Sequence, residues 1–173
     1  AAPPAEMASL YREIHRLGGR EEGGEEDLAA ISQFLLRDDR AGGAFLCELE
    51  VFKDIYCLEA RSAARSQRGV YLGLLSAVMR DGSSPPLKLL NNYMDRLADC
   101  IRGSLRRGDV AAKYSAAQYV LLLPTSSAEN GRLALERIVS RFVERYPRCP
   151  LLLRPSIRPV DTIPEPPYQI RRK

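Results

Sequence analysis

The feature that most constrains the fold of this chain is a pair of short apolar stretches separated by only four small or polar residues. Residues 110–114 (VAAKY) alternate in the way that is typical of a strand, and residues 119–123 (YVLLL) form a second apolar strand that ends before Pro124. The intervening SAAQ is a tight turn. The two stretches are therefore predicted to form a β-hairpin.

Further strands and helices are predicted on both sides of this hairpin. Residues 70–79 (VYLGLLSAVM) are nearly all apolar, which is typical of a strand buried on both faces. Apolar side chains at steps of three and four predict a long helix over 87–105. A Ser/Thr cap followed by an acid at 125–129 predicts another helix that ends near Tyr146. A last short strand is expected over 151–153, with a proline-rich surface tail after it.

Upstream of this core the sequence predicts only helices. Apolar residues recur at helical spacing over 5–17 and 27–37, and a wide apolar stripe predicts a long helix over 44–66. We therefore expect residues 1–66 to form a helical extension that links to a preceding domain, and residues 67–173 to form the folded domain. From the long helix onward, the order helix, strand, helix, strand, strand, helix, strand predicts an α/β sandwich with a mixed sheet.

Composition excludes several classes of protein. The 173 residues are 45% hydrophobic and 28% charged, close to a globular average, which excludes full disorder. No apolar run is long enough for a transmembrane helix, so no membrane partner is expected. The start Ala1–Pro4 lacks the features of a secretory signal and is typical of a linker within a longer protein. A net charge of +4, dispersed along the chain, does not indicate nucleic-acid binding by this segment.

The cysteines and the single histidine do not predict a metal site. The cysteines at positions 47, 57, 100 and 149 form no CxxC pair, and His15 lies off the apolar stripe of its helix, at a position expected to be solvated. Thiols within helical patterns behave as small apolar side chains. We expect reduced core cysteines, no cofactor and a cytoplasmic location.

The run from Arg106 to Ile138 resembles the centre of a GGDEF domain, the fold of diguanylate cyclases. In that family a helix ends at Arg-x-x-Asp, matched here by Arg106 and Asp109, and the Gly-Gly-Asp/Glu-Glu-Phe hairpin motif begins six residues after the Asp. At that offset this chain has Ser115, Ala116, Ala117, Gln118 and Tyr119. The following VLLLP and TSSAENGRLALERI resemble the family's strand, proline and capped helix. The resemblance covers about 68–158 and implies a palm-like nucleotide cyclase fold with an N-terminal helical extension.

The same resemblance implies that cyclase chemistry has been lost. A diguanylate cyclase uses carboxylates on its first core strand and in its hairpin turn to hold two metal ions, which activate a 3′-hydroxyl and hold the triphosphate. This chain has Ser76 or its neighbours where the strand acid belongs, and Ala117 and Gln118 where the turn acids belong. Neutral side chains cannot supply the charge that a divalent metal site requires. We therefore expect no catalytic residues, no metal and no enzyme activity.

The surviving Arg-x-x-Asp implies a receptor site for cyclic di-GMP. Arg106 can engage a guanine edge or a phosphate, Asp109 can accept hydrogen bonds from guanine N1 and N2, and Arg102 can add charge one turn earlier. The same residues also have a purely structural interpretation. An arginine at a helix end pairs with the helix dipole, and an aspartate before a strand is an ordinary turn residue. The sequence leaves both interpretations open.

A second resemblance concerns the protein to which the domain belongs. Residues 43–66 (GAFLCELEVFKDIYCLEARSAARS) look like the segment that precedes degenerate GGDEF domains in bacterial transcriptional regulators with a bacterial transcriptional activator domain. This implies a non-catalytic sensory domain that binds a cyclic dinucleotide, forms a homodimer, and belongs to a protein whose other domains bind DNA. The alternative is a dimerisation or protein-interaction module without a ligand, in which the 44–66 helix pairs across a two-fold axis. An enzyme with other catalytic groups is a third hypothesis.

Overall fold

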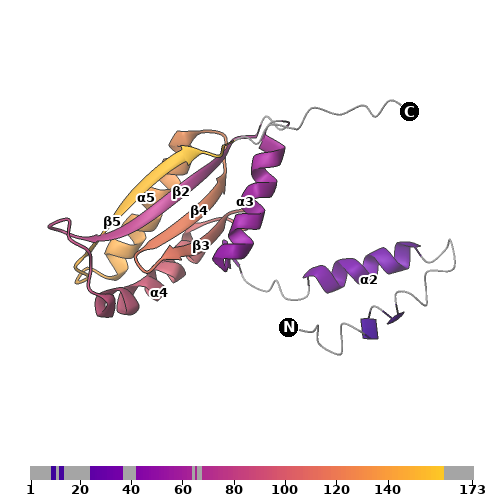
Figure 1. Ribbon diagram of the computed structural model, residues 1–173, viewed down its shortest axis with the longest axis horizontal. Coiled ribbons are helices and arrows are strands. Elements are labelled where there is room, and N and C mark those ends of the chain that lie inside the picture. The colour runs from indigo at the N-terminus through magenta and orange to yellow at the C-terminus, as the bar shows by residue number, and fades with distance from the viewer. Residues whose placement is uncertain are drawn as a thin grey trace, which may run out of the picture. The chain divides into compact units, whose positions relative to one another are not determined.

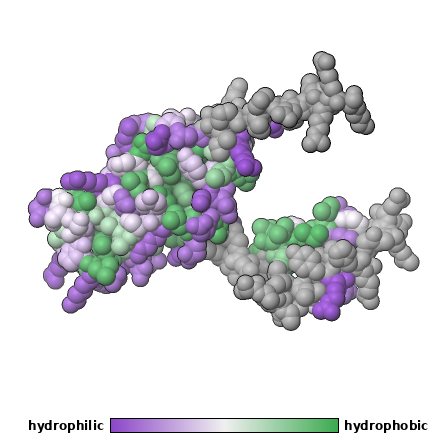
Figure 2. Space-filling model, in the orientation of Figure 1, coloured by the Kyte–Doolittle hydropathy of each residue, from purple (hydrophilic) through white to green (hydrophobic). Residues whose placement is uncertain are grey.

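The computed structural model divides the chain into two units, residues 1–41 and 42–173. The residues that it describes are 9–10, 12–13, 24–36, 42–63, 65 and 68–161. In the first unit, helix α2 (Gly24–Leu36) confirms the helix predicted over 27–37 and begins with an acidic first turn. Most of the helix predicted over 5–17, including His15, lies outside the described residues. α2 buries none of its side chains, and apolar surface gathers on this helix in Figure 2.

The second unit is built on a mixed five-stranded sheet with the strand order β1-β3-β4-β2-β5 (Figure 1). β1 pairs in parallel with β3, and all the other neighbours are antiparallel. The predicted strand over 70–79 and the predicted hairpin are confirmed. The strands are β1 (Phe45–Cys47), β2 (Val70–Met79), β3 (Val110–Ser115), β4 (Gln118–Pro124) and β5 (Leu151–Pro159).

Three helices cover the two faces of this sheet, α3 (Leu49–Ala63), α4 (Leu87–Ser104) and α5 (Ala128–Arg145). α4 and α5 pack in the larger core, which also takes Leu121 and Leu123 of β4. α3 packs in a second, smaller core, where Phe52 contacts the opposite face of the sheet together with Leu122. Alternate residues of β4 thus enter different cores, as the twofold periodicity of a strand requires. Among the described residues, no helix has the length and apolar character of a membrane span.

The start of α5 shows the predicted cap. The hydroxyl of Ser127 accepts a hydrogen bond from the backbone N–H of Asn130 at 3.1 Å, which satisfies one of the free donors of the first helical turn. The helix therefore begins at Ala128, directly after the cap.

The prediction of one continuous helix over 44–66 was wrong at its beginning. Phe45–Cys47 is a short strand at the edge of the sheet, and the helix begins only at Leu49. A short apolar run fits a strand or a helix equally well, and here pairing with β3 decides the outcome. Residues 42–63, which we expected within the extension 1–66, are consequently part of the sheet unit, because the structural division falls after Ala41.

The last strand is longer than predicted. It continues past 151–153 to Pro159, through two prolines that we expected to lie in a surface tail. The N–H of Val160 donates to the carbonyl of Val70 at 3.0 Å, and hydrogen-bonded pairs alternate along an antiparallel ladder. Pro155 and Pro159 therefore occupy positions that face away from β2, where an edge strand needs no donor.

The prediction of core cysteines concerned Cys47, Cys57 and Cys100 and is confirmed for Cys100, and Cys149 is buried as well. Cys100 and Cys149 are buried, and desolvation raises the pKa of both thiols. Little reactive thiolate therefore forms at neutral pH. Cys47 is half-buried and lies in a strand, and Cys57 is exposed on α3, against the prediction. All four are free thiols.

Gly43 lets the backbone just before β1 lie close to the end of α4. Its φ is 81°, and a Cβ atom there would lie against the carbonyl oxygen of Arg102. The neighbouring N–H of Ala44 donates to that same carbonyl at 3.3 Å. The backbone contact that holds β1 at the sheet edge thus has no room for a side chain.

We expect Gly43→Ala to reduce the free energy of unfolding by about 3 kcal/mol or more, because it combines left-handed strain with a backbone clash. Gly82→Ala is the matched control: its φ is 82°, but nothing lies within 4 Å of the added Cβ. The control should cost only about 1 kcal/mol, the strain alone. Urea unfolding of the full chain measures both values, and equal losses would contradict the close approach.

Candidate functional site

The loop between α4 and β3 is a tight turn that the side chain of Asp109 closes. The N–H of Asp109 donates to the carbonyl of Arg106 at 3.1 Å, and the Asp109 carboxylate Oδ2 accepts from the N–H of Arg106 at 2.9 Å. The carbonyl of Asp109 accepts from the N–H of Phe45 at 2.9 Å. Asp109 is only 8% exposed, the one buried charged side chain among the described residues. The turn therefore joins the end of α4 to both β1 and β3.

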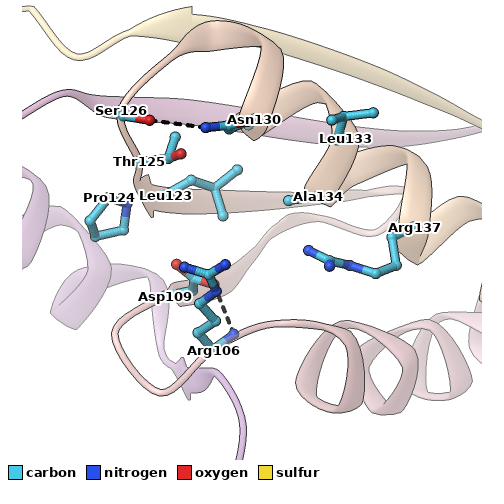
Figure 3. Close-up of a pocket in the computed structure, with 11 residues that line it drawn as sticks. Arg106, Asp109, Leu123, Pro124, Thr125, Ser126, Asn130, Leu133, Ala134 and Arg137 are labelled. Carbon is cyan, nitrogen blue, oxygen red and sulfur yellow. Dashed lines mark hydrogen bonds between the residues drawn. The ribbon is translucent and has the colours of Figure 1, made fainter.

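A pocket of about 340 Å³ lies beside this turn (Figure 3). It is bounded by the turn, the end of β4, the loop that follows β4 and the first turns of α5. The residues that line it are Arg106, Asp109, Leu123, Pro124, Thr125, Ser126, Asn130, Gly131, Leu133, Ala134 and Arg137.

Two guanidinium groups enter this pocket from different elements. Figure 3 shows Arg106, from the turn, rising beside Asp109, and Arg137, from α5, extending toward it. Neither side chain makes an ion pair with any residue that the structure describes. The one acid in the lining is Asp109. Two unpaired cations beside the beginning of a helix form an environment that suits an anion.

The environment of the Asp109 carboxyl shifts its pKa upward. Desolvation by burial is the largest cause and raises the pKa, because it disfavours the charged form. The hydrogen bond from the Arg106 N–H and the positive charges of Arg106 and Arg137 lower the pKa and offset part of this effect. The carboxylate is thus held in place by the turn at an electrostatic cost.

The structure brings together only two of the three ligand residues expected from the sequence. Arg106 and Asp109 share the pocket, but Arg102 does not line it and instead pairs with Asp99 at 3.4 Å on the exposed surface of α4. Sequence reasoning missed Arg137. The spacing of Asn130, Leu133 or Ala134, and Arg137 would have placed these residues on one helix face, but only the fold turns that face toward Arg106.

The hairpin positions that would carry metal ligands are occupied by a neutral hydrogen-bonded chain. Ser76 and Gln118 are cross-strand partners, and Gln118 Nε2 donates to Ser76 Oγ at 3.1 Å. Ser115 Oγ donates to Gln118 Oε1 at 3.0 Å. These side chains satisfy one another and carry no negative charge, so they do not fit a divalent cation.

The rest of the hairpin motif is structural. The carbonyl of Ala117 accepts from the N–H of Ala77 at 2.8 Å, which ties the turn to β2, and Ala116 is exposed at the tip. Tyr119 is buried, and its hydroxyl donates to the carbonyl of Met94 at 3.3 Å. In the described part of the chain, no three His, Cys, Asp or Glu side chains gather closely enough to hold a metal. This turn lies at the opposite end of β3 from the arginine pocket.

Comparison with known proteins identifies the fold. No family model matches the chain, and no curated protein matches it. Among solved structures, the diguanylate cyclase SiaD in complex with its activator SiaC from Pseudomonas aeruginosa aligns with a TM-score of 0.50 and 17% sequence identity, over 88% of this chain and 60% of that one. The GGDEF domain of DgcB from Caulobacter crescentus in complex with c-di-GMP aligns with a TM-score of 0.48 and 17% identity, over 69% of this chain and 77% of that one.

The chain has the mixed-sheet α/β architecture of GGDEF domains, as the sequence predicted. It spans 60% of the length of the SiaD chain, and the identity of 17% extends the likeness to the fold alone. What the pocket binds must therefore be argued from its own residues.

The raised pKa of Asp109 predicts a pH dependence of stability. The folded chain binds more protons than the unfolded chain between the unfolded and folded pKa values, so the contribution of Asp109 to stability falls as pH rises through that interval. Asp109→Asn should remove this step and keep an oxygen that accepts from Arg106. The test is the difference in unfolding free energy between wild type and variant from about pH 3 to pH 7. A difference that favours the wild type more strongly at higher pH would contradict the assignment.

Proposed function

We propose that this chain is a non-catalytic receptor domain of a bacterial transcriptional regulator, and that it binds a cyclic dinucleotide in the pocket between Arg106 and Arg137. Cyclic di-GMP is the ligand that the family resemblance implies. The observation that carries the proposal is the pair of unpaired guanidinium groups directed into one pocket. Phosphodiester oxygens are the acceptors that such groups bind best.

The loss of catalysis in this proposal rests on the hairpin end of the sheet. Metal-dependent nucleotidyl transfer needs carboxylates that hold divalent cations near the triphosphate. The polar side-chain atoms there instead form hydrogen bonds with one another, in the chain Ser115–Gln118–Ser76. A nucleotide bound at the other end of β3 would be separated from this turn by the length of the strand, so binding and synthesis need not share residues.

The hydrogen bonds of the turn support a route by which binding could act on the rest of the protein. A ligand that draws on the Arg106 side chain acts on the turn that Asp109 closes, and the carbonyl of Asp109 holds the N–H of Phe45. Phe45 opens β1, which leads directly into α3. Ligand binding at the turn would thus change how firmly β1 is held to the sheet. β1 connects the sheet to the chain upstream, where we expect the regulator's other domains.

Calorimetry with cyclic di-GMP tests the ligand site. We expect Arg106→Met and Arg137→Met each to weaken binding by about 10- to 100-fold, the effect of losing a hydrogen bond to a charged group. Arg107→Met is the matched control, because Arg107 is an exposed arginine of the same turn that does not line the pocket. Absence of heat from the wild type, or an equal loss in the control, would reject the proposal.

The second expected outcome concerns turnover. Incubation of the chain with GTP and Mg²⁺ should yield no cyclic di-GMP or other product above a protein-free blank, because the hairpin end offers no anionic metal ligands. Nucleotide analysis by liquid chromatography measures this, with an active diguanylate cyclase as the positive control. Product formation that scales with the concentration of the chain would overturn the non-catalytic assignment.

A dimerisation module without a ligand is the second candidate, and one observation favours it. α3 exposes two apolar side chains seven residues apart, Val51 and Leu58. Its buried side chains, Phe52 and Ala60, pack in the smaller core. A second copy could bury this stripe across a two-fold axis. Light scattering distinguishes the candidates: a dimer that forms without nucleotide favours this one, and a monomer that dimerises only with nucleotide favours the receptor.

A further inference from the structure

We infer that the outer surface of α4 and α5 binds the phosphate backbone of nucleic acid, without regard to base sequence. Three side chains form the centre of this surface, Arg96 on α4 and Arg141 and Arg145 on α5, and we call them the arginine surface. None of them lines the pocket beside Arg106. The site is therefore distinct from that pocket and does not depend on what the pocket binds.

The net charge of +4 hides a separation of charge between the two faces of the sheet. α4, α5 and the segments that follow them (87–108 and 128–148) carry 10 basic and 5 acidic side chains. On the opposite face, α3 and the residue before it (48–63) carry 2 basic and 4 acidic side chains. The fold thus gathers on one face a positive charge that is dispersed along the sequence. A basic face opposite an acidic one orients the domain toward a polyanion.

Contacts between α4 and α5 bring the two α5 arginines against α4. Nη1 of Arg141 donates to the carbonyl of Gly103, at the end of α4, at 2.6 Å. Gly103 leaves room for this contact, since a Cβ atom there would lie 3.2 Å from the same nitrogen. Burial raises the pKa of the Cys100 thiol, and a hydrogen bond from Arg145 offsets part of that rise. Both guanidinium groups are therefore held at the boundary between the two helices.

The guanidinium of Arg96 is held between two aromatic rings. Its Cζ lies 5.3 Å from the ring centroid of Tyr93, on α4, and 5.3 Å from that of Tyr146, directly after α5. A guanidinium stacked on an aromatic face keeps its N–H groups in its own plane, where they can still donate. The two rings thus fix the position of this cation without using its donors.

Each cation of the arginine surface is fixed by a neutral group and not by an acid. The partners are aromatic rings, a backbone carbonyl and a thiol. All three arginines are exposed, and none forms an ion pair with a residue that the structure describes. A guanidinium has five N–H donors, so one contact with a neutral group leaves most of them available. The surface is therefore a set of positioned charges that can accept an anionic partner.

The acids of the same two helices leave this surface positive. Two of the five pair with basic side chains outside it, Asp99 with Arg102 and Glu129 with Arg132. Glu144 is the acid nearest in sequence to the α5 arginines, and it forms no ion pair with any residue that the structure describes. The arginines therefore keep their charge for a partner.

The kind and spacing of the cations favour a nucleic-acid strand. Of the 10 basic side chains on this face, 9 are arginines, which donate paired hydrogen bonds to phosphate. Arg141 and Arg145 are four residues apart, about 6 Å along the axis of α5. A duplex strand presents one phosphate for about every 3.4 Å of its axis, so such a row can follow one strand.

The test is the fluorescence anisotropy of a labelled DNA duplex of about 20 base pairs, titrated with the full chain between about 20 and 200 mM salt. Three phosphate contacts predict a slope of about −2.7 for log K against log salt. Arg141→Met combined with Arg145→Met should reduce the slope to about −1 and weaken binding about tenfold or more at low salt. Arg132→Met, an exposed arginine of α5 that pairs with Glu129, is the matched control and should change neither quantity.

Lysine at positions 141 and 145 separates a loss of charge from a loss of fold. Because the slope depends on charge, Arg141→Lys with Arg145→Lys should keep a slope near that of the wild type. An unchanged slope in the double Met variant, an equal loss in Arg132→Met, or no binding at about 20 mM salt would overturn the inference. Displacement of the duplex by poly-glutamate at equal charge would instead assign the surface to an acidic protein.

Discussion

One buried carboxylate organises the end of the sheet on which the candidate site depends. Asp109 gives up most of its hydration to close the turn between α4 and β3, and the raised pKa of its carboxyl reflects that cost. In return its side chain satisfies the N–H of Arg106, and its backbone carbonyl satisfies the N–H of Phe45. Asp109 thus contacts the helix end and the edge strand and also lines the pocket.

The two ends of β3 have opposite characters, and this polarity is the basis of the functional proposal. At one end, Arg106 and Arg137 line a pocket with Asp109, and neither forms an ion pair with a residue that the structure describes. At the other end, Ser76, Gln118 and Ser115 form a closed neutral chain in which each polar group finds a protein partner. Unsatisfied charge indicates a place where a ligand can contribute free energy, whereas satisfied neutral groups gain little from one.

Much of the fold could be predicted from periodicity, and the failures have physical causes. The strand over 70–79 was predictable because ten successive residues suit a doubly buried strand and suit no amphipathic helix. Phe45–Cys47 is too short for its period to be read, so its pairing with β3 could not be foreseen. The extent of β5 was hidden by Pro155 and Pro159, which are compatible with a strand only where the missing N–H faces away from the neighbour.

The sequence by itself determined the hairpin, the alternation of helices and strands, and the absence of acids from the hairpin turn, because these depend on residues close together in the chain. Only the tertiary structure decided which distant side chains share a pocket. It brought Arg137 opposite Arg106, left Arg102 outside, and assigned the carboxylate of Asp109 to the turn. The physical reason is that helical spacing tells which residues share a face, but the packing of α5 against the sheet and α4 determines what that face meets.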